Sequence, residues 1–399
     1  MKKMMRTTAL GGALVFMAAS AQAMDGGFMV GNTTFKMGGY VDLDLHYTDY
    51  SAGTTPANRI DRDMYIPSLT PTGPADANGN THFDMQAQTS RLSFTAKNGG
   101  TTGYIEIDFL GGDGNERVSN SFAPRIRRAF IKNGNWLMGQ EWSTFQNLSA
   151  IPESASFLAA SDGQIFVRQP MVRWTNGPLQ IALENPGESR ITNNGIDDEG
   201  NPAILRFERD EAERPDIVVR YNYKADFGNI SASLLNRQIK MTATDEDDNF
   251  DEDTISFNIA GRVKAGPGDV RFSYSSGEGM GRYIGLHAAN EADLRFNADG
   301  DEVGVDLNES TGYVLAYRLP LGNDGARLNI GMSSLEVDDP AEAELETVSS
   351  QYVAYLWSPA PKLTYGIEYM TGTTEFDAPQ GTTDEGDIDR FTFSAKFAF

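Results

Sequence analysis

The sequence predicts an all-β protein: a transmembrane antiparallel β-barrel of about 16 strands, with short periplasmic turns, long external loops and one loop folded into the lumen. Three observations support this prediction. Apolar and polar residues alternate along many segments, short and long connections alternate along the chain, and one long connection is rich in apolar residues without a regular period. Alternation with a period of two places apolar side chains on one face of a strand and polar side chains on the other.

The N-terminus has the organisation of a secretory signal peptide. Lys2, Lys3 and Arg6 precede an apolar stretch at 9–19, and Ala21-Gln22-Ala23 offers small residues at a cleavage site. We therefore expect residues 1–23 to be removed and residues 24–399 to form one barrel domain. No later segment has the 18 consecutive apolar residues of a transmembrane helix. Cysteine is absent, which excludes disulfides and thiolate metal sites.

The terminal strands show the clearest alternation. Residues 35–47 alternate between apolar and polar side chains, and residues 390–399 do the same up to Phe399. The pattern recurs at 105–109, 179–184, 217–223, 255–264, 270–274 and 313–319. A water-soluble β-sandwich also contains alternating strands, although they are usually shorter. The spacing of the connections must therefore decide between the two architectures.

Short and long connections follow one another in turn. Seven short turns, most with Gly, Asn, Asp or Pro, are expected at 97–102, 132–135, 175–178, 225–229, 265–269, 321–326 and 358–362. Eight long polar segments separate them, at 48–88, 110–124, 142–164, 186–215, 241–253, 275–309, 335–348 and 373–388. Fifteen connections join sixteen strands, and long loops at one end only are typical of outer-membrane barrels. Segment 349–357 is apolar on both faces, which is compatible with a subunit contact or a misplaced turn.

One long connection is expected to lie inside the barrel. Between the strand-like segments 136–142 and 165–174, the chain has no period of 2 or 3.6 but contains Phe145, Ile151 and Leu158. Long irregular connections are usually functional or disordered, and this one is too apolar for a solvated linker. We therefore expect residues 143–163 to fold against the inner wall as a constriction loop that narrows a pore.

The charge of the chain limits its partners. A formal net charge of -23 argues against nucleic acid. Residues 245–253 contain seven acidic residues and residues 336–346 contain six, without any Lys or Arg. We interpret these runs as solvated loops. They are also compatible with divalent cations that link the loops to each other or to lipopolysaccharide phosphates.

Several stretches resemble the DcaP-like family of trimeric outer-membrane porins. They are Phe35-Lys36-Met37-Gly38-Gly39-Tyr40-Val41, Gly139-Gln140-Glu141-Trp142-Ser143-Thr144-Phe145, Ile165-Phe166-Val167-Arg168-Gln169-Pro170 and Ala182-Leu183-Glu184-Asn185-Pro186. The likeness is best over about residues 35–186, and strand spacing extends it to the C-terminus. Some members carry a helix-prone extension before the barrel, whereas only about ten residues precede the first strand here, so that part is not carried over.

The resemblance implies a homotrimer in the outer membrane of a Gram-negative bacterium, in contact with its lipid and lipopolysaccharide. Each subunit would form its own channel for small hydrophilic, often anionic solutes such as dicarboxylates. Pro152-Glu153 is similar to the loop tip of sixteen-stranded trimeric porins. The aromatic ending, with Phe397 and Phe399, is similar to the signal read by the outer-membrane assembly machinery.

Arginines in mid-strand are expected to face the lumen, because an Arg facing lipid at the bilayer midplane costs roughly 2–4 kcal/mol. Arg128 falls on the lipid-facing phase, which requires a β-bulge or a position near a strand end. Arg168 and Arg173 have opposite parity, so both point inward only if the strand slips by one residue, for which Pro170 is the expected place. The candidate pore-lining arginines are Arg91, Arg125, Arg127, Arg168, Arg173, Arg220, Arg237, Arg262, Arg271 and Arg318.

These arginines predict the selectivity of the pore. Glu153 and Asp162 in the loop are expected to face arginines on the opposite wall, which would create a transverse field at the narrowest point. Fixed positive charge concentrates anions, and Arg stays charged and fits carboxylates. We therefore expect small anionic solutes to be preferred. The competing interpretation is a neutral, weakly selective or cation-preferring wall, in which the arginines pair with Asp42, Asp44, Glu106, Asp108, Glu184 and Glu368.

We expect no enzymatic activity, no cofactor and no metal site. His46, His82 and His287 have no Ser and Asp placed to complete a catalytic triad, and the sequence has no Walker, zinc or nucleotide motif. The alternative function is an outer-membrane barrel whose long acidic loops bind a surface partner or lipopolysaccharide, with little solute selectivity.

Overall fold

The computed structural model describes residues 27–56, 59–74, 77–112, 119–120, 122–196, 202–209, 212–241, 250–296, 302–322, 325–338, 340, 344–378 and 382–399. The predicted signal peptide, residues 1–23, lies outside these ranges. Within them, no helix has both the length and the apolar character needed to span a bilayer.

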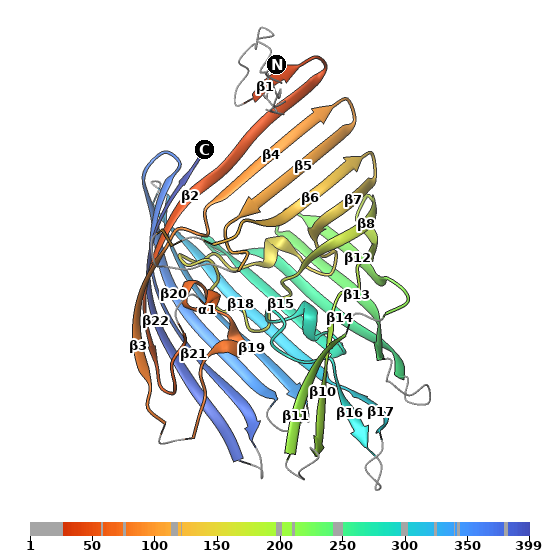
Figure 1. Cartoon of the computed structure of the whole chain (residues 1–399). Helices are drawn as coiled ribbons and strands as arrows, with labels where there is room; N and C mark the ends of the chain where they lie inside the picture. The colour runs from red at the N-terminus through yellow and green to blue at the C-terminus, as the bar shows by residue number, and fades with distance from the viewer. Residues whose placement is uncertain are drawn as a thin grey trace, which may run out of the picture.

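Sixteen antiparallel strands form a closed barrel (Figure 1), which confirms the predicted all-β antiparallel barrel of about 16 strands. One wall position is shared by two strands that both pair with β2, and the barrel closes where β2 pairs with β22. In order around the wall, the strands are β2 (Thr33–Tyr50), β3 (Asn80–Gln86) with β4 (Arg91–Asn98), β5 (Thr101–Asp108), β6 (Arg125–Asn133), β7 (Trp136–Trp142), β8 (Arg168–Asn176), β9 (Leu179–Glu184), β12 (Asp216–Ala225), β13 (Gly228–Met241), β14 (Phe250–Ala265), β15 (Gly268–Glu278), β18 (Glu309–Leu321), β19 (Ala326–Asp338), β20 (Leu345–Ala360), β21 (Leu363–Ala378) and β22 (Thr382–Ala398).

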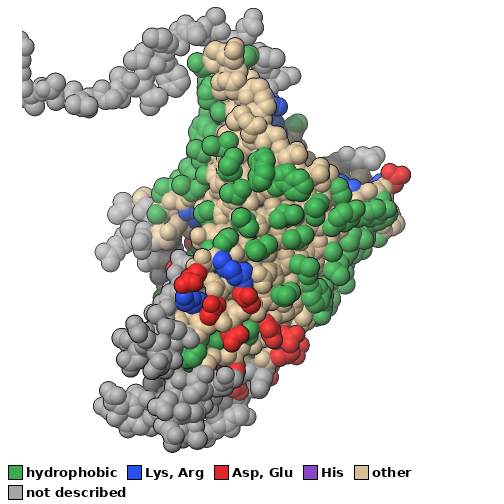
Figure 2. Space-filling model, turned by 90° about the vertical axis from the view of Figure 1, so that its right-hand side faces the viewer, with side chains coloured by type: hydrophobic (Ala, Val, Ile, Leu, Met, Phe, Trp, Pro, Cys, Tyr) green, Lys and Arg blue, Asp and Glu red, His purple; other side chains and the backbone are tan. Residues whose placement is uncertain are grey.

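The two faces of the wall are the reverse of those in a water-soluble protein. Along β2, Val41 and Tyr47 are 59% and 56% exposed, whereas Asp42, Asp44 and His46 are buried. Figure 2 shows hydrophobic side chains across the middle of one side of the barrel, with acidic side chains gathered below them. Because exposed apolar area costs roughly 25 cal/mol per Å² in water, this outer band is suited to lipid.

All seven predicted short turns are present, at one end of the barrel. Several use glycine in the left-handed region: Gly99, Gly134 and Gly177 have φ of 54°, 54° and 57°. A residue with a Cβ is strained at such angles, so glycine permits a tight connection here.

The other end of the barrel differs in detail from the sequence prediction. The predicted loops 335–348 and 373–388 are largely strand, because β20, β21 and β22 continue for 16, 16 and 17 residues, beyond the roughly 9–11 that cross a bilayer. The predicted loops 186–215 and 275–309 contribute a separate four-stranded sheet, made of β10 (Ser189–Ile196), β11 (Pro202–Arg209), β16 (Ala292–Phe296) and β17 (Glu302–Leu307).

Three connections pack against the inner face of the wall. They are residues 59–70, with α1 (Ile60–Asp63) and η1 (Pro67–Leu69); residues 143–167, with η2 (Leu148–Ala150); and residues 279–291, with η4 (Gly281–Tyr283). Figure 1 shows them inside the outline of the barrel. Phe145, Ile165, Tyr283 and Ile284 form one apolar cluster with wall residues such as Leu335.

The same packing explains why β20 is apolar on both faces. Tyr352, Ala354 and Leu356 are buried and cluster with Ala155 and Ala159 of the 143–167 segment. Residues 353 and 355 between them are on the outer, exposed face. Neither a subunit contact nor a misplaced turn is needed to account for this strand.

Candidate pore-lining site

The 143–167 segment is held by polar groups of strands that are far apart in the sequence. It leaves β7, passes along the inner face from β13 to β21, and returns to β8. Its hydrogen bonds to the wall run from Asn147 Nδ2 to Ser231 Oγ (2.9 Å), from Arg271 Nη1 to Ile151 O (2.8 Å), from Ala155 N to Glu368 Oε2 (2.7 Å) and from Gly163 N to Ser333 Oγ (2.7 Å). Each partner is on the polar face of its strand, so the segment and the inner wall share one hydrogen-bonded surface.

Glu153 is bound directly to two arginines of the wall. Its carboxylate accepts hydrogen bonds from Arg318 Nε on β18 and Arg327 Nε on β19, each at 2.9 Å. Burial opposes ionisation of Glu153, but the Arg327 and Arg318 guanidinium groups outweigh it and keep the pKa below its usual value. The sequence prediction placed Glu153 across a pore from the arginines. In the structure Glu153 is in direct contact with Arg318 and Arg327, so these ion pairs neutralise its charge locally.

Asp162 is completely buried and has no exposed surface on a pore. Tyr65 Oη donates a hydrogen bond to Asp162 Oδ1 at 2.6 Å, and Ser350 Oγ on β20 donates to Oδ2. Burial raises the pKa of Asp162 to about 6, although the hydrogen bonds from Ser350 and Tyr65 favour the ionised form. The carboxyl therefore joins the 59–70 connection, the 143–167 segment and β20, which is a positioning role.

Replacing Asp162 with Asn is expected to remove a pH-dependent part of the stability. The unfolded carboxyl ionises near pH 3.9 and the folded one near 6, so the wild-type free energy of unfolding should fall by about 2 to 3 kcal/mol as pH rises from 4 to 6. The difference between wild type and D162N should change over that window, go on changing more weakly to about pH 7 and be flat above it. Equilibrium unfolding from lipid vesicles at several pH values measures this difference. Asp226→Asn, on an exposed turn, is the control, and equal pH profiles for wild type and D162N would contradict the assignment.

Arginines of β4 and β6 meet two carboxylates of β5. Arg125 donates through Nε and Nη2 to Asp108 at 2.9 and 3.0 Å, and Arg127 donates to Glu106 at 2.9 Å and to Asp108 at 2.7 Å. Arg91 Nη1 lies 3.6 Å from Glu106 Oε1. The side chain of Arg127 is buried, whereas those of Arg91 and Arg125 are 21% and 28% exposed. The Arg91 and Arg125 side chains are therefore accessible to a solute.

Arg128 also faces inward because β6 has a bulge. Glu106 is paired with Arg128 and Ile107 with Ile126, which leaves Arg127 as the extra residue between them. Two residues of β6 therefore oppose one position of β5, and both arginines reach the polar face. Arg128 donates to Glu141 on β7 at 2.6 Å. The required bulge was anticipated from the parity of the sequence, and its position is now defined.

The predicted slip at Pro170 is wrong. Pairing between β7 and β8 is continuous from Trp136↔Trp174 to Trp142↔Arg168, so Arg168 and Arg173 are on opposite faces of this ribbon. Arg173 Nη1 donates to Trp142 O at 3.3 Å, whereas the Arg168 guanidinium lies 4.5 Å from the Trp142 ring centre. The backbone ladder from β6 to β7 ends at Gln140, and beyond it the ribbon contacts β6 through side chains such as Glu141. Its outer face can therefore turn toward β6, where Arg127 approaches the same Trp142 ring.

We call the group made by these side chains the β4–β8 basic cluster. It consists of Arg91, Arg125, Arg127, Arg128 and Arg168 with Glu106, Asp108 and Glu141. Five guanidinium groups stand against three carboxylates, an excess of two positive charges. The competing interpretation is confirmed in part, because Arg91, Arg125 and Arg127 pair with Glu106 and Asp108. The pairing nevertheless leaves the cluster with this excess of positive charge.

A second group, the β14–β19 basic cluster, consists of Arg262, Lys264, Arg271, Arg318 and Arg327 with Asp269 and Glu153. Arg220 on β12 lies apart from both clusters and donates to Gln180 Oε1 at 2.9 Å and to Gln146 O. Arg220 thereby ties the start of the 143–167 segment to β9 and β12.

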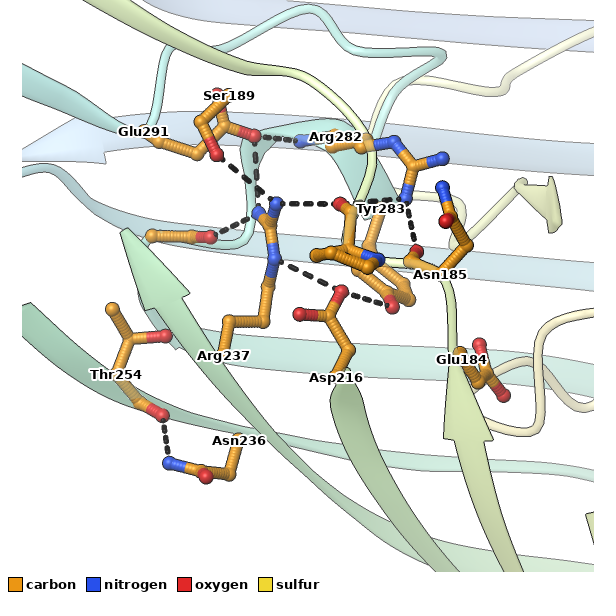
Figure 3. Close-up of polar contacts among 12 residues, drawn as sticks. Glu184, Asn185, Ser189, Asp216, Asn236, Arg237, Thr254, Arg282, Tyr283 and Glu291 are labelled. Atoms are coloured by element: carbon orange, nitrogen blue, oxygen red, sulfur yellow. Dashed lines mark hydrogen bonds and ion pairs between the residues drawn. The ribbon is translucent and has the colours of Figure 1, made fainter. Parts of the chain in front are cut away.

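Arg237 has a different role from the other predicted arginines. It is completely buried on β13, with Nε 3.2 Å from Asp216 Oδ2 and Nη1 3.2 Å from Glu291 Oε1, and it donates to Gly279 O at 2.7 Å (Figure 3). Tyr283 Oη donates to the same Asp216 oxygen at 2.7 Å. Arg237 is therefore an anchor for the 279–291 connection and has no surface for a solute.

In the described part of the chain, several basic residues of the inner face were not among the predicted site residues, among them Arg128, Lys264, Arg327, Arg390 and Lys396. Parity could have found three of them, because Lys264, Arg390 and Lys396 alternate with outward-facing apolar residues. Lys396 Nζ lies 3.0 Å from Asp42 Oδ2. Arg327 is adjacent to a turn, where the sequence pattern gives no strand phase. The aromatic residues of the predicted assembly signal, Phe397 and Phe399, are 48% and 45% exposed.

A closed barrel with an apolar outer belt, a polar inner wall and charged groups held on that wall is a membrane channel of the porin type. Its sequence profile assigns it more specifically: the chain belongs to the family of the DcaP outer membrane protein, whose profile matches residues 21–399. The predicted location in the Gram-negative outer membrane is therefore confirmed. Among curated proteins, none matches the sequence.

Solved structures show the same fold. The chain is similar to the outer membrane channel DcaP of Acinetobacter baumannii, with 18% identity and a TM-score of 0.69 over 94% of this chain and 100% of that one. It is also similar to the anion-selective porin from Comamonas acidovorans, with 11% identity and a TM-score of 0.53 over 92% of this chain and 100% of that one. At these identities the likeness establishes the architecture.

Proposed function

We propose that the protein is a passive channel for small hydrophilic solutes that prefers anions, with dicarboxylates as the expected substrate class. The observation that carries this proposal is the excess of positive charge in the β4–β8 basic cluster, where Arg91 and Arg125 remain partly exposed. Charge fixed on a low-dielectric wall raises the local concentration of counter-ions and their entry rate. Arg also offers paired donors that match a carboxylate.

In this proposal the 143–163 loop sets the width of the passage. Its apolar side chains pack with wall residues of β12, β13, β19 and β20, and its tip is fixed by Glu153 to Arg318 and Arg327. Because the loop fills one side of the lumen and is anchored at several points, it narrows the passage that remains open. The β4–β8 basic cluster, whose Arg127 lies 5.5 Å from the centre of the Phe157 ring of the loop, supplies the charged side of that passage.

The proposal includes a homotrimer that the outer-membrane assembly machinery inserts after removal of residues 1–23. Strands β4, β5, β7 and β9 have only 8, 8, 7 and 6 residues, fewer than the roughly 9–11 that span a bilayer. These strands are shorter than the bilayer is thick, and a neighbouring subunit would shield this part of the wall from lipid. The outer face there has a groove of about 670 Å³ beside Ala96, Gly103 and Ala129, which would allow close approach of a second wall.

Uptake into liposomes tests the proposed function. Vesicles containing the protein should swell faster in an isotonic dicarboxylate such as succinate than in a diamine of the same size, because the fixed charge favours anions. Empty vesicles and vesicles with heat-denatured protein are the controls. Equal swelling rates in both solutes would contradict the anion preference and indicate a non-selective porin. The absence of swelling in either solute would contradict the proposed channel function.

The alternative, a barrel whose acidic loops bind a surface partner or lipopolysaccharide, has one supporting observation. Asp251, Glu252 and Asp253 are exposed next to each other at the start of β14. Shortening the 242–249 connection and neutralising these three residues separates the two functions. Solute uptake should survive the change if the protein is primarily a channel, whereas binding to lipopolysaccharide in the presence of calcium should be lost if the loops are the functional part.

A further inference from the structure

The end of the barrel with the short turns contains a second basic site, distinct from the β4–β8 basic cluster. In outer-membrane barrels this end is the periplasmic one. A cavity of about 450 Å³ lies beside the turns that join β12 to β13, β14 to β15 and β18 to β19. Its lining includes Asn229, Arg262, Lys264, Asp269 and Arg318.

The strand register brings these residues into one arc of the inner wall. Lys264, Asp269 and Arg318 are direct cross-strand neighbours on β14, β15 and β18. Arg262 is paired in the same way with Arg271, one layer farther from the turns. Neighbouring strands are about 4.8 Å apart, so the side chains are close enough to act on one small ligand.

The charges of this arc do not cancel. Asp269 accepts from Arg262 Nε and Nη2 at 2.9 and 2.8 Å and from Arg271 Nε at 3.0 Å, and Arg318 Nη1 lies 3.7 Å away. One carboxylate is thus shared by three guanidinium groups. Within the β14–β19 basic cluster, five cations stand against Asp269 and Glu153, an excess of three positive charges.

Part of this excess charge is available to a ligand. The side chain of Arg262 is 43% exposed and Lys264 is exposed as well. The Asn229 amide on β13 borders the same cavity and adds further hydrogen-bonding groups. Arg262 binds Asp269 through Nε and Nη2, which leaves its Nη1 group. This group, the Lys264 ammonium and the Asn229 amide are donors suited to an oxyanion. A volume of about 450 Å³ is at the small end of ligand pockets.

We propose that this cavity is a binding site for a small oxyanion, a carboxylate or a phosphate, at the periplasmic mouth of the channel. The proposal rests on the proposed passage of anions, because the occupant is an anion that has crossed the barrel or approaches it from the periplasm. An anion that leaves the β4–β8 basic cluster then meets a second attractive site before it reaches bulk solution. Occupancy of that site also repels the next anion, so added oxyanion should inhibit the flow of chloride from one side.

Side-specific inhibition by inorganic phosphate tests the site. Chloride current is recorded through the protein in a planar bilayer while phosphate is added to one compartment at a time. Wild type should be inhibited at a lower concentration from the periplasmic side than from the other. The variant R262Q/K264Q should need at least about tenfold more periplasmic phosphate for half-inhibition, because two charged donors are lost.

Two further variants make the outcome decisive. K97Q/K132Q removes two exposed lysines at the same end of β4 and β6, outside the cavity, and should shift half-inhibition by less than about threefold. The swap R262K/K264R keeps the charge and should retain inhibition. Equal inhibition of wild type and R262Q/K264Q, or an equal loss in K97Q/K132Q, would overturn the proposed site. Anion preference, read from the reversal potential of the same channels, tests the proposed function separately, since it can persist when the phosphate site fails.

Discussion

Replacing Arg125 and Arg127 with glutamine is expected to lower the ratio of anion to cation permeability by about three- to tenfold. The two changes bring the β4–β8 basic cluster from an excess of two positive charges to none, because Arg91, Arg128 and Arg168 then face three carboxylates. Glu106 and Asp108 also lose their closest guanidinium partners. Both effects make the passage less attractive to anions. Reversal potentials in a salt gradient measure the ratio.

The variant R125K/R127K is the matched control, because it keeps the charge while removing the forked geometry. It should retain most of the anion preference, although the bidentate contact to Asp108 is lost. Loss of preference in the lysine variant as well would mean that geometry rather than charge sets selectivity. An unchanged ratio in R125Q/R127Q would mean that these side chains do not lie along the route of the ions.

Replacing Arg237 with methionine is expected to reduce the free energy of unfolding by about 3–5 kcal/mol. The substitution leaves Asp216 and Glu291 buried without their common cationic partner. Burial opposes ionisation of Glu291, and His287 and Arg237 together lower its pKa to about 2, so this carboxylate remains charged near neutral pH. Removing one member of a buried ion-pair network costs far more than the network as a whole contributes. Equilibrium unfolding from lipid vesicles measures the loss.

Two comparisons test the reason for this loss. Arg214→Met removes an arginine whose ion-pair partner, Asp253, is 68% exposed, and should cost less than about 1 kcal/mol. The triple variant R237M/D216N/E291Q removes the buried charges together and should recover part of the stability that R237M loses. If the triple variant is no more stable than R237M, the uncompensated charges are not the source of the effect. The 279–291 connection should also become more accessible to protease in R237M than in wild type.

Much of the barrel could be predicted from the sequence because its physics is local. A strand between lipid and water must alternate, and a tight hairpin must use turn residues, so parity and spacing reveal the strands, the turns and the inward direction of most arginines. Arg128 shows how far this reasoning extends. Its parity requires a bulge or a position near a strand end, and the pairing of Glu106 with Arg128 next to Ile107 with Ile126 shows that the bulge is the explanation.

The parts that were missed depend on contacts between residues far apart in the chain. Pro170 looked like a point of slippage, but the β7–β8 pairing runs through it, and Arg168 reaches the interior because the ribbon leaves β6 after Gln140. Nothing in the neighbouring residues encodes that departure. Arg237 has the parity of a pore-lining residue, yet the 279–291 connection covers it completely.

The acidic residues of the loop show the same limit. Their position in an inward-folding segment could be read from the sequence. Whether each faces a solute or a wall residue depends on its distant partners, Arg318 and Arg327 for Glu153 and Tyr65 and Ser350 for Asp162.

The reversal potential of the wild-type channel in a potassium chloride gradient at neutral pH tests the central claim most directly. That claim is that the excess positive charge of the β4–β8 and β14–β19 basic clusters decides which ions pass. We predict a reversal potential that is shifted from zero toward the equilibrium potential of chloride, with anions several-fold more permeant than cations. A potential at zero, or shifted toward the equilibrium potential of potassium, would contradict this claim, because the arginines would then be balanced by carboxylates along the route.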